Sequence, residues 1–272
     1  MQRIGIMAAM HDEIAGLLAQ MASFTTRRIG MRDYHTGLLH GQRCVVVLAR
    51  IGKVAAAATA VTLIREFNVN ALVFTGLAGG VAAPVRVGDV VIGTTLLQHD
   101  LDASPLFPRH QVPLLGCSHL AADPALAGLL DQAAHDYLMN DWPRDISPAS
   151  RSAFGLEQPR VHRGLIISGD QFICEASTVQ ALRAELPDAL CVEMEGAAVA
   201  QICHEYDLPF AVLRVVSDRA DDTACHDFNA FLSGVASHYS AGIVQRFIQA
   251  VRHNDNRPTV AGGAIDQACR KG

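Results

Sequence analysis

Short apolar runs rich in β-branched residues alternate along this chain with longer segments of helical periodicity. The strand-like runs are IGIMA (4–8), CVVVLA (44–49), ALVFTG (71–76), DVVIGTT (89–95), GLIISG (164–169), ALCVEM (189–194) and FAVLRVVS (210–217). The helical segments cover 12–21, 53–67, 124–138, 176–186, 196–206 and 228–251. Such alternation is typical of a largely parallel sheet covered by helices. We therefore predict an α/β fold.

The composition excludes several classes of partner. Of the 272 residues, 50% are hydrophobic and 18% are charged, and the net charge is -5. A chain with no excess of Lys and Arg is poorly suited to a phosphate backbone, so we expect no nucleic-acid partner. The apolar runs are too short or too charged to cross a membrane, and the N-terminus does not resemble a signal peptide. We expect a cytoplasmic protein with no membrane association.

Neither a repeat nor a linker divides the core, so we expect one domain over residues 1–252. Within it, NDWPRDISPASRSAFGLEQPR (140–160) is rich in Pro, Ser and Arg and is typical of an excursion from the domain. Residues 253–272 have few apolar side chains to pack, and we expect a flexible C-terminal tail.

The cysteines and histidines do not match a metal motif. The seven cysteines lie at positions 44, 117, 174, 191, 203, 225 and 269, without a CxxC or a zinc-like spacing. We expect reduced, mostly buried thiols and no bound metal.

Polar or glycine-rich segments follow most of the predicted strands. They are MHDE (10–13), ARIGK (49–53), TGLAGG (75–80), SGDQFI (168–173), EMEG (193–196) and SDRAD (217–221). In an open α/β sheet, ligands bind at the carboxyl ends of the strands. We therefore expect these segments to line one pocket. The glycines of TGLAGG permit close approach of the backbone, although a tight turn would explain them equally well.

EMEG places two carboxylates where burial of charge is costly. The alternation of side chains along a strand puts Glu193 and Glu195 on one side and Met194 on the other. A carboxylate at a strand end can accept hydrogen bonds from two vicinal hydroxyls. The alternative for both acids is a structural ion pair with an arginine.

Asp218 and Glu13 are further acids near strand ends. Asp218 follows FAVLRVVS, and a desolvated Asp can hold a proton and give it to a leaving group. A helix cap or a loop turn is the alternative. Glu13 lies early in the first predicted helix, where the helix dipole alone favours an acid. Its position by itself indicates only a surface residue.

The order and wording of several motifs resemble one known family. The motifs are IGIMAAMHDE, RIGKVAAA, TGLAGG, VGDVVIG, SGDQFI, VEMEGAAVA and VLRVVSDRAD, spread from residue 4 to residue 222. They are similar to those of the methylthioadenosine/S-adenosylhomocysteine nucleosidases, in the nucleoside phosphorylase-I family. The resemblance implies a three-layer α/β/α sandwich around a central mixed, barrel-like sheet. It also implies a homodimer and neither a metal nor an organic cofactor.

The resemblance also implies roles for particular residues. Glu13 would position or activate the attacking water. Asp218, oriented by Ser217, would protonate the purine at N7. Met194 and Glu195 would hold the ribose. The other candidate substrate-binding residues are Gly79, Glu193, Phe172, which would stack on adenine, Ile173, whose backbone would read the adenine edge, and Met10, Ile51 and Phe228, which would enclose the 5′ substituent. Core packing is the alternative for the last three.

These roles describe hydrolysis of the N-glycosidic bond of a 5′-modified adenosine. An oxocarbenium-like transition state needs an acid for the leaving group and a nucleophile on the opposite face. Asp218 and Glu13 would divide these tasks. One alternative is a phosphate-dependent purine nucleoside phosphorylase. The other is a non-catalytic nucleoside-binding protein, against which the joint presence of Glu13, Glu195 and Asp218 argues.

Three departures from the family pattern bear on the acceptor and the 5′ group. Leu77 stands where a Ser is common, and Arg50 stands where a Gly is common. A guanidinium at position 50 could bind an anion, which keeps the phosphorylase alternative open. We expect it instead to pair with Glu13 or another acid. The segment DLDASPLFPRHQVP (100–113) also differs, and in the family this region reaches toward the neighbouring subunit's 5′ pocket.

Overall fold

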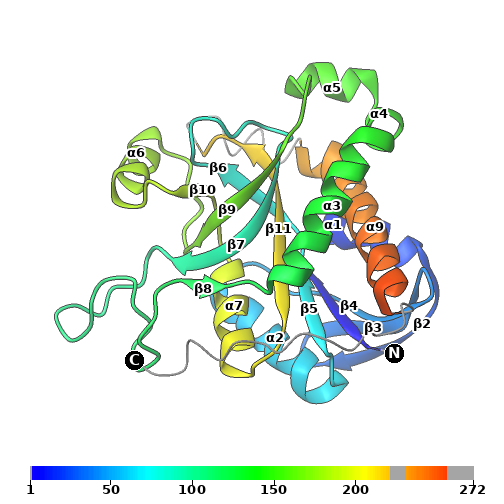
Figure 1. Cartoon of the computed structure of the whole chain (residues 1–272), viewed down its shortest axis with the longest axis horizontal. Helices are drawn as coiled ribbons and strands as arrows, with labels where there is room; N and C mark the ends of the chain where they lie inside the picture. The colour runs from blue at the N-terminus through cyan, green and yellow to red at the C-terminus, as the bar shows by residue number, and fades with distance from the viewer. Residues whose placement is uncertain (1, 221–230, 256–272) are drawn as a thin grey trace, which may run out of the picture.

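The computed structural model describes residues 2–220 and 231–255 as a mixed sheet packed between helices (Figure 1). The strands are β1 (Ile4–Ala8), β2 (Met21–Ile29), β3 (Arg32–Leu39), β4 (Gln42–Leu48), β5 (Ala71–Phe74), β6 (Leu77–Gly80), β7 (Val90–Gln98), β8 (Leu120–Ala121), β9 (Val161–Ser168), β10 (Ala189–Glu193) and β11 (Phe210–Asp218). The helices are α1 (His11–Ala19), α2 (Lys53–Phe67), α3 (Pro124–Asn140), α4 (Trp142–Asp145), α5 (Pro148–Phe154), α6 (Ala176–Glu185), α7 (Gly196–Glu205), the short π-helix η1 (Leu232–Ala236) and α9 (Ser237–Asp255).

Part of the sheet closes on itself. The strand order is β2-β3-β4-β1-β5-β11-β6-β10-β9-β7-β8, and β11 also pairs with β7. The strands β11, β6, β10, β9 and β7 therefore form a closed ring, with both parallel and antiparallel neighbours. The predicted mixed, barrel-like sheet is confirmed.

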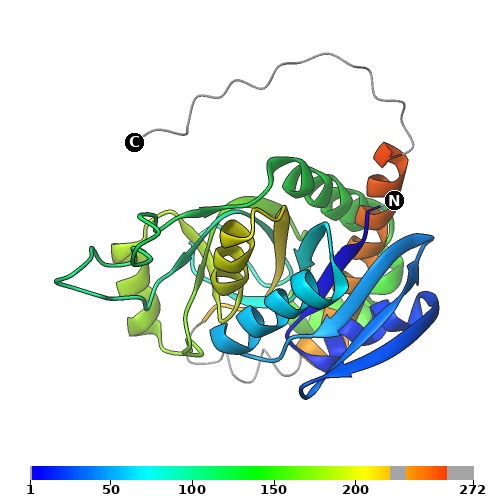
Figure 2. The same cartoon turned by 90° about the horizontal axis from the view of Figure 1, so that it is seen from below.

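Helices cover the sheet on two sides, as Figures 1 and 2 show. Along β1, Ile4, Ile6 and Ala8 belong to the core cluster that includes α1, α3 and α9. Met7, which points the other way, belongs to the cluster that includes α2 and α7. A strand buried on both faces explains the continuous apolar run IGIMA, and the predicted three-layer arrangement is confirmed.

The hairpin β2–β3 was not among the predicted strands. Residues 22–28 of β2 are all exposed, so the sequence lacks the apolar alternation that marks a half-buried strand. The hairpin lies at one edge of the sheet (Figure 1), and tight turns connect β2 to β3 and β3 to β4. One of these turns has positive φ at both His40 (47°) and Gly41 (80°), as a type I′ turn requires.

The segment 140–160, predicted to be an excursion from the domain, contains the helices α4 and α5. Trp142 is buried, and its Nε1–H donates a hydrogen bond to the hydroxyl of Tyr239 on α9 (2.6 Å). Ile146 and Leu156 are also buried in the main core cluster. The segment projects at its α5 end (Figure 1) but is anchored to the domain by these three side chains. At the C-terminus, α9 runs to Asp255, and the rest of the predicted tail lies outside the described residues.

The described cysteines are free thiols. Cys44, Cys191 and Cys203 are buried, and burial raises the pKa of each. In the part of the chain that the structure describes, no group of three or more His, Cys, Asp or Glu side chains could hold a metal ion. Among the same residues, no helix is both long enough and apolar enough to span a membrane.

Candidate active site

A cavity lies where the strand ends of the sheet converge. It is lined by Ala9, Met10, Glu13, Ile51, Gly76, Leu77, Ala78, Gly79, Gln171, Phe172, Ile173, Val192, Glu193, Met194, Glu195, Arg214 and Asp218. These residues come from each of the six polar or glycine-rich segments that follow the strands in the sequence. The expected single pocket is therefore present.

Ten of the twelve candidate residues line this cavity. They are Met10, Glu13, Ile51, Gly79, Phe172, Ile173, Glu193, Met194, Glu195 and Asp218. Ser217 is buried behind Asp218 and contacts it directly. Phe228 lies outside the described residues. Two apolar candidates remain open to solvent, since Ile51 is 54% exposed and Phe172 is 39% exposed. Their exposure at a cavity mouth argues against a role in core packing alone.

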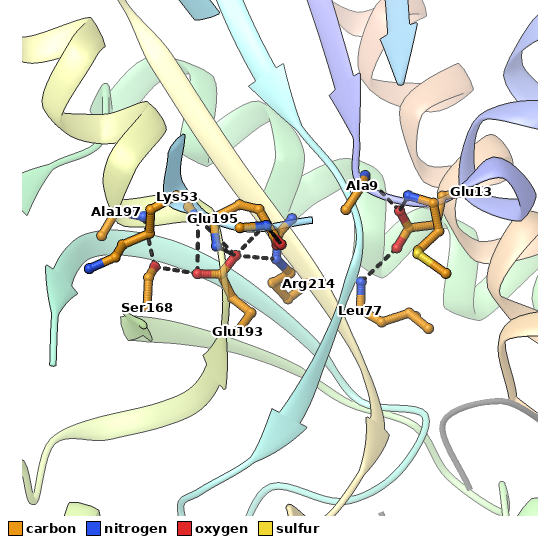
Figure 3. A network of polar contacts seen from close by, with 12 residues as sticks. Ala9, Glu13, Lys53, Leu77, Ser168, Glu193, Glu195, Ala197 and Arg214 are labelled. Carbon is orange, nitrogen blue, oxygen red and sulfur yellow. Dashed lines mark hydrogen bonds and ion pairs between the residues drawn. The ribbon is translucent and has the colours of Figure 1, made fainter. Parts of the chain in front are cut away.

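Glu13 is buried on α1, contrary to the surface position that its sequence context indicates. Its Oε2 accepts hydrogen bonds from the backbone N–H groups of Ala9 (2.9 Å) and Met10 (2.8 Å). Its Oε1 accepts one from the N–H of Leu77 (3.0 Å). Figure 3 shows this network. Burial raises the pKa of the Glu13 carboxyl, while these donors and the charge of Arg214 oppose the rise.

Arg214 and Glu193 form an ion pair inside the protein (Figure 3). Arg214 donates to Glu193 Oε2 through Nε (3.1 Å) and Nη2 (2.5 Å), and both side chains are almost fully buried. The Glu193 carboxylate also accepts hydrogen bonds from the Ser168 hydroxyl and from the N–H of Gly196 (2.9 and 2.8 Å). Gly196 begins α7, where backbone N–H groups need acceptors. The contacts of Glu193 are therefore those of a structural ion pair, which was the alternative to substrate binding.

Glu195 is held differently from Glu193. Its Oε1 accepts a hydrogen bond from the N–H of Gly52 (2.9 Å), and its Oε2 lies 3.9 Å from Arg214 Nη2. Burial and the neighbouring Glu193 charge raise the pKa of Glu195 to about 8, and the Arg214 charge limits the rise. Glu195 thus has fewer strong partners in the protein than Glu193, and it faces the cavity.

Asp218 is buried at the end of β11. Its Oδ2 accepts a hydrogen bond from the hydroxyl of Ser217 (2.7 Å), and its Oδ1 accepts one from the N–H of Ala220 (2.8 Å). A methyl group at Gly79 would lie 3.0 Å from Asp218 Oδ1, so this glycine leaves room beside the carboxyl group. The serine and the backbone fix the orientation of Asp218 toward the cavity.

Sequence reasoning did not assign Arg214 to the site. A charged residue in the middle of the apolar strand FAVLRVVS was the available signal, because a buried guanidinium requires a carboxylate partner. Ser168, which donates to Glu193 and accepts from the N–H of Ala197 (2.7 Å), was also missed. Its position at the end of β9, beside β10, is a consequence of the sheet topology rather than of local sequence.

Arg50 does not pair with Glu13. Its Nη2 donates a hydrogen bond to the carbonyl of Met31 (2.6 Å), and no described carboxylate lies within 4.0 Å of its guanidinium. The backbone φ of Arg50 is 72°, a value that favours glycine, which explains why Gly suits this position. Leu77 is buried, and its backbone N–H donates a hydrogen bond to Glu13 Oε1 (3.0 Å).

Known proteins are similar to this chain in sequence and in fold. The family model described as the phosphorylase superfamily matches residues 3–249. The 5′-methylthioadenosine/S-adenosylhomocysteine nucleosidase of Anoxybacillus flavithermus is 34% identical over 246 residues, covering 90% of this chain and 97% of that protein. The nucleosidase of Chromohalobacter salexigens is 34% identical over 250 residues, covering 92% of this chain and 97% of that protein.

Solved structures agree with these relatives. The 5′-methylthioadenosine/S-adenosylhomocysteine nucleosidase of Neisseria meningitidis, in complex with methylthio-immucillin-A, has a TM-score of 0.80 and 34% identity, covering 92% of this chain and all (100%) of that chain. A futalosine hydrolase mutant of Helicobacter pylori has a TM-score of 0.78 and 29% identity, with 92% and 100% coverage. Structures similar to this chain therefore include both a 5′-methylthioadenosine/S-adenosylhomocysteine nucleosidase and a futalosine hydrolase.

Proposed function

The chain belongs to the phosphorylase superfamily and, within it, to the 5′-methylthioadenosine/S-adenosylhomocysteine nucleosidases, and from this premise we propose how its residues perform the hydrolysis. It is an N-glycosyl hydrolase that cleaves 5′-modified adenosine and releases adenine. The observation that carries the assignment of roles is the convergence of Glu13, Glu195 and Asp218, all buried, on one cavity.

Asp218 is the general acid of this proposal. The bond between N9 of adenine and C1′ of the ribose breaks, and its electron pair stays with the base. Asp218 gives its proton to N7, so that adenine leaves as a neutral molecule. The hydrogen bonds from Ser217 (2.7 Å) and Ala220 (2.8 Å) orient the carboxyl group for this transfer. The sugar is left as an oxocarbenium-like species.

Glu13 receives the proton of the attacking water. The water oxygen bonds to C1′, and Glu13 takes the proton that the water loses. Three backbone N–H groups fix both carboxylate oxygens of Glu13, so its position is defined before the substrate enters. The raised pKa of Glu13 makes it a better base than an ordinary carboxylate. Proton exchange with solvent then restores Glu13 and Asp218 to their starting states.

Glu195 and Met194 hold the ribose. One oxygen of Glu195 accepts a hydrogen bond from the N–H of Gly52 (2.9 Å). The carboxylate can accept further hydrogen bonds, so it is available to the vicinal hydroxyls of the ribose. Such hydroxyls donate to the charged form, so ribose binding lowers the raised pKa of Glu195. Glu193, which the sequence assigned to the substrate, is proposed to act through Arg214 and the start of α7.

The adenine and the 5′ substituent occupy the two ends of the cavity. Phe172 stacks on the adenine ring, and the backbone of Ile173 hydrogen-bonds its edge. Met10 and Ile51 enclose the 5′ substituent, and Phe228, outside the described residues, is proposed to join them. Gly79 allows the base to lie close to the backbone beside Asp218. The exposed fraction of Phe172 (39%) gives the base a surface on which to stack.

Water rather than phosphate is the proposed acceptor. Arg214 is the only Lys or Arg among the described residues that line the cavity, and its guanidinium is paired with Glu193. Arg50, which kept the phosphorylase alternative open, is not among the lining residues. A phosphate dianion would therefore meet little compensating charge in the cavity.

The test is incubation with 5′-methylthioadenosine in phosphate-free buffer and again with phosphate, followed by chromatography and mass spectrometry of the products. Adenine and the free methylthio-sugar are expected without phosphate. A strict requirement for phosphate, with a sugar 1-phosphate product, would identify a phosphorylase. Binding without cleavage of any 5′-modified adenosine would identify the non-catalytic alternative.

We also propose a homodimer of single-domain subunits, with residues 1–252 as the domain. The loop between β7 and β8 projects from the molecule (Figure 1) and exposes Leu106 (83%) and Leu114 (91%). Exposed apolar side chains on a projecting loop are suited to a partner subunit. Light scattering coupled to size exclusion tests the dimer, and the double variant Leu106→Ser/Leu114→Ser is expected to weaken it.

The cytoplasmic location is likewise a proposal. Its support is the free state of the described cysteines, since reduced thiols persist in a cytosolic environment. Cell fractionation with a cytosolic marker is the test. No cofactor enters any step of the proposed reaction.

A further inference from the structure

A second cavity, of about 450 Å³, lies beside the active-site cavity and is called the side groove below. It is bounded by one side of α1, the tip of the β2–β3 hairpin and the end of β4 with the turn that follows it. Two of its lining residues adjoin lining residues of the active-site cavity in the chain. His11 follows Met10, and Arg50 precedes Ile51. At these two points the side groove borders the end of the active-site cavity that Met10 and Ile51 line.

Three arginines give the side groove an excess of positive charge. Arg28 lies 3.9 Å from Asp33, an exposed and weak pairing. Arg32 donates to the carbonyls of Ala49 (3.1 Å) and Ala55 (3.3 Å) instead of to an acid.

Arg50 likewise donates only to a carbonyl, that of Met31 (2.6 Å). Within the described part of the chain, neither Arg32 nor Arg50 has a carboxylate within 4.0 Å. The other ionisable groups that line the groove are Asp12, His11 and His35. Two guanidinium charges thus remain without a carboxylate partner.

The backbone of Arg50 is strained in a way that a glycine would relieve. Its φ of 72° lies in the left-handed region, which disfavours residues with a Cβ atom. Strained residues of this kind cluster at functional sites. An exposed arginine in this conformation, at the border of two cavities, has a cost without an evident gain in packing.

We propose that the side groove binds a carboxylate at the far end of the 5′ substituent, with Arg50 as its principal ligand. The proposal rests on the proposed function, in which Met10 and Ile51 enclose that substituent. A substituent longer than a methyl group passes between them and arrives at Arg50. The planar guanidinium presents two parallel N–H donors to a carboxylate, so it selects an anionic end over a neutral one.

The experiment compares substrates that differ only in charge. The substrates are 5′-deoxy-5′-(3-carboxypropylthio)adenosine and its primary amide, with 5′-methylthioadenosine as the reference for catalytic competence. Adenine release gives kcat/KM for each. At low salt, the wild-type protein is expected to prefer the carboxylate over the amide by roughly two- to fivefold, the size of effect for a partly exposed charge pair. The preference is expected to shrink in about 1 M salt, which screens such pairs.

Arg50→Gly is the informative variant because glycine suits the φ of 72° and the variant is expected to fold. It should bring the ratio of carboxylate to amide close to one. Arg50→Lys keeps the charge but not the planar fork, and an intermediate ratio is expected. The matched control is Arg27→Ala. Arg27 lies on the same hairpin but pairs with Glu66 on α2 (2.8 Å) outside the side groove, so the ratio should stay at the wild-type value.

The outcomes separate this proposal from the proposed function. The proposal for the side groove is overturned if the wild-type protein cleaves the carboxylate and the amide equally well. It is also overturned if Arg50→Gly leaves their ratio unchanged. In both cases the proposed hydrolysis stands. The proposal is also overturned if Arg27→Ala lowers the ratio of carboxylate to amide as much as Arg50→Gly does. The overall charge of the protein, and not the side groove, would then explain the preference. Failure to cleave any of the compounds, 5′-methylthioadenosine included, overturns the proposed function instead.

S-adenosylhomocysteine is a further substrate in this experiment, and it tests whether an amine next to the carboxylate changes its recognition. It carries the same carboxylate with an ammonium group beside it. A loss in Arg50→Gly similar to that of the carboxypropyl compound supports recognition of any terminal carboxylate. A loss confined to the carboxypropyl compound supports a groove for carboxylates without a neighbouring amine.

Discussion

The Arg214 guanidinium and the Glu193 carboxylate form a buried ion pair, with Nη2 and Oε2 separated by 2.5 Å. The two residues lie on β11 and β10, which are not neighbours, because β6 lies between them in the sheet. A methyl group at Gly76, immediately before β6, would lie 3.1 Å from Arg214 Nη1. The glycine thus leaves space for the guanidinium to reach across.

Removing one partner of this pair is expected to destabilise the protein strongly. In Arg214→Met, the Glu193 charge stays buried without its partner, and the free energy of unfolding should fall by about 3 to 5 kcal/mol. The double variant Arg214→Met/Glu193→Gln removes both charges and should recover part of this loss. Urea denaturation of the wild-type protein, Arg214→Met, Glu193→Gln and the double variant is the measurement. If the double variant is as unstable as the sum of the single variants, the two residues are not coupled.

Glu13 is expected to be needed for hydrolysis but not for folding. Glu13→Gln keeps the shape of the side chain and loses its ability to take a proton, so kcat should fall by about 10²- to 10⁴-fold. Nucleoside binding, followed by calorimetry, should remain. Asp12→Asn is the matched control, since Asp12 is the exposed neighbour of Glu13 on α1, and its kcat should stay near the wild-type value. Loss of binding in Glu13→Gln would assign Glu13 a structural role.

The sequence predicts most of the strands that are buried on both faces, but it misses the hairpin β2–β3 at the sheet edge and the short, glycine-rich β6. β1 and α2 have the predicted bounds, because an uninterrupted apolar run and a regular helical stripe mark them. β2 was missed because its side chains face solvent over residues 22–28. Gly30, between β2 and β3, and Gly41, between β3 and β4, were the local sequence signals for these two turns, since both adopt positive φ (58° and 80°).

The cavity residues could be found from strand ends, but their partners could not. The Ser168, Glu193 and Arg214 network joins three strands through the closure of the sheet. Local patterns carry no information about which strands become neighbours after closure. The same limit explains Arg50, for which the sequence indicated an acidic partner while the structure supplies the carbonyl of Met31.

Glu195 is expected to make the protein less stable as the pH rises. Its pKa is raised to about 8 in the folded protein, from an ordinary value of 4.5, because of burial and the Glu193 charge. Between these two values the folded state binds more protons than the unfolded state, so the free energy of unfolding falls with pH. Glu195→Gln removes this contribution. Its advantage over the wild-type protein should grow from about pH 5 to pH 8 by on the order of 2 kcal/mol.

Denaturation by urea at several pH values measures this effect. Glu13 has a pKa raised in the same direction, so the wild-type slope contains both residues and only the difference from Glu195→Gln isolates one. A constant difference between pH 5 and pH 8 would show that Glu195 titrates outside this range. A saturating ribonucleoside is expected to reduce the difference, because the hydroxyls stabilise the charged carboxylate.

Asp218 and Ser217 should differ in the size of their effects. Asp218→Asn cannot donate the proton to N7, so kcat should fall by about 10²- to 10⁴-fold. Ser217→Ala removes only the orienting hydrogen bond (2.7 Å), and a smaller loss, about tenfold, is expected. Circular dichroism should show folded protein in both cases. Near-normal turnover by Asp218→Asn would remove Asp218 as the acid.

Two glycine substitutions separate crowding at the site from the intrinsic preference of glycine. In Gly76→Ala, the new methyl group would lie 3.0 Å from Glu13 Oε1 and 3.1 Å from Arg214 Nη1. One or both charged groups must shift, so kcat/KM should fall by about tenfold or more, since small displacements at a site are costly. In Gly128→Ala, on α3, the methyl group meets no atom within 4 Å and only improves helix propensity. Activity should then be unchanged and stability should rise by about 0.5 to 1 kcal/mol. Assays of kcat/KM and thermal unfolding on both variants measure this contrast, and an active Gly76→Ala would show that Glu13 and Arg214 tolerate displacement.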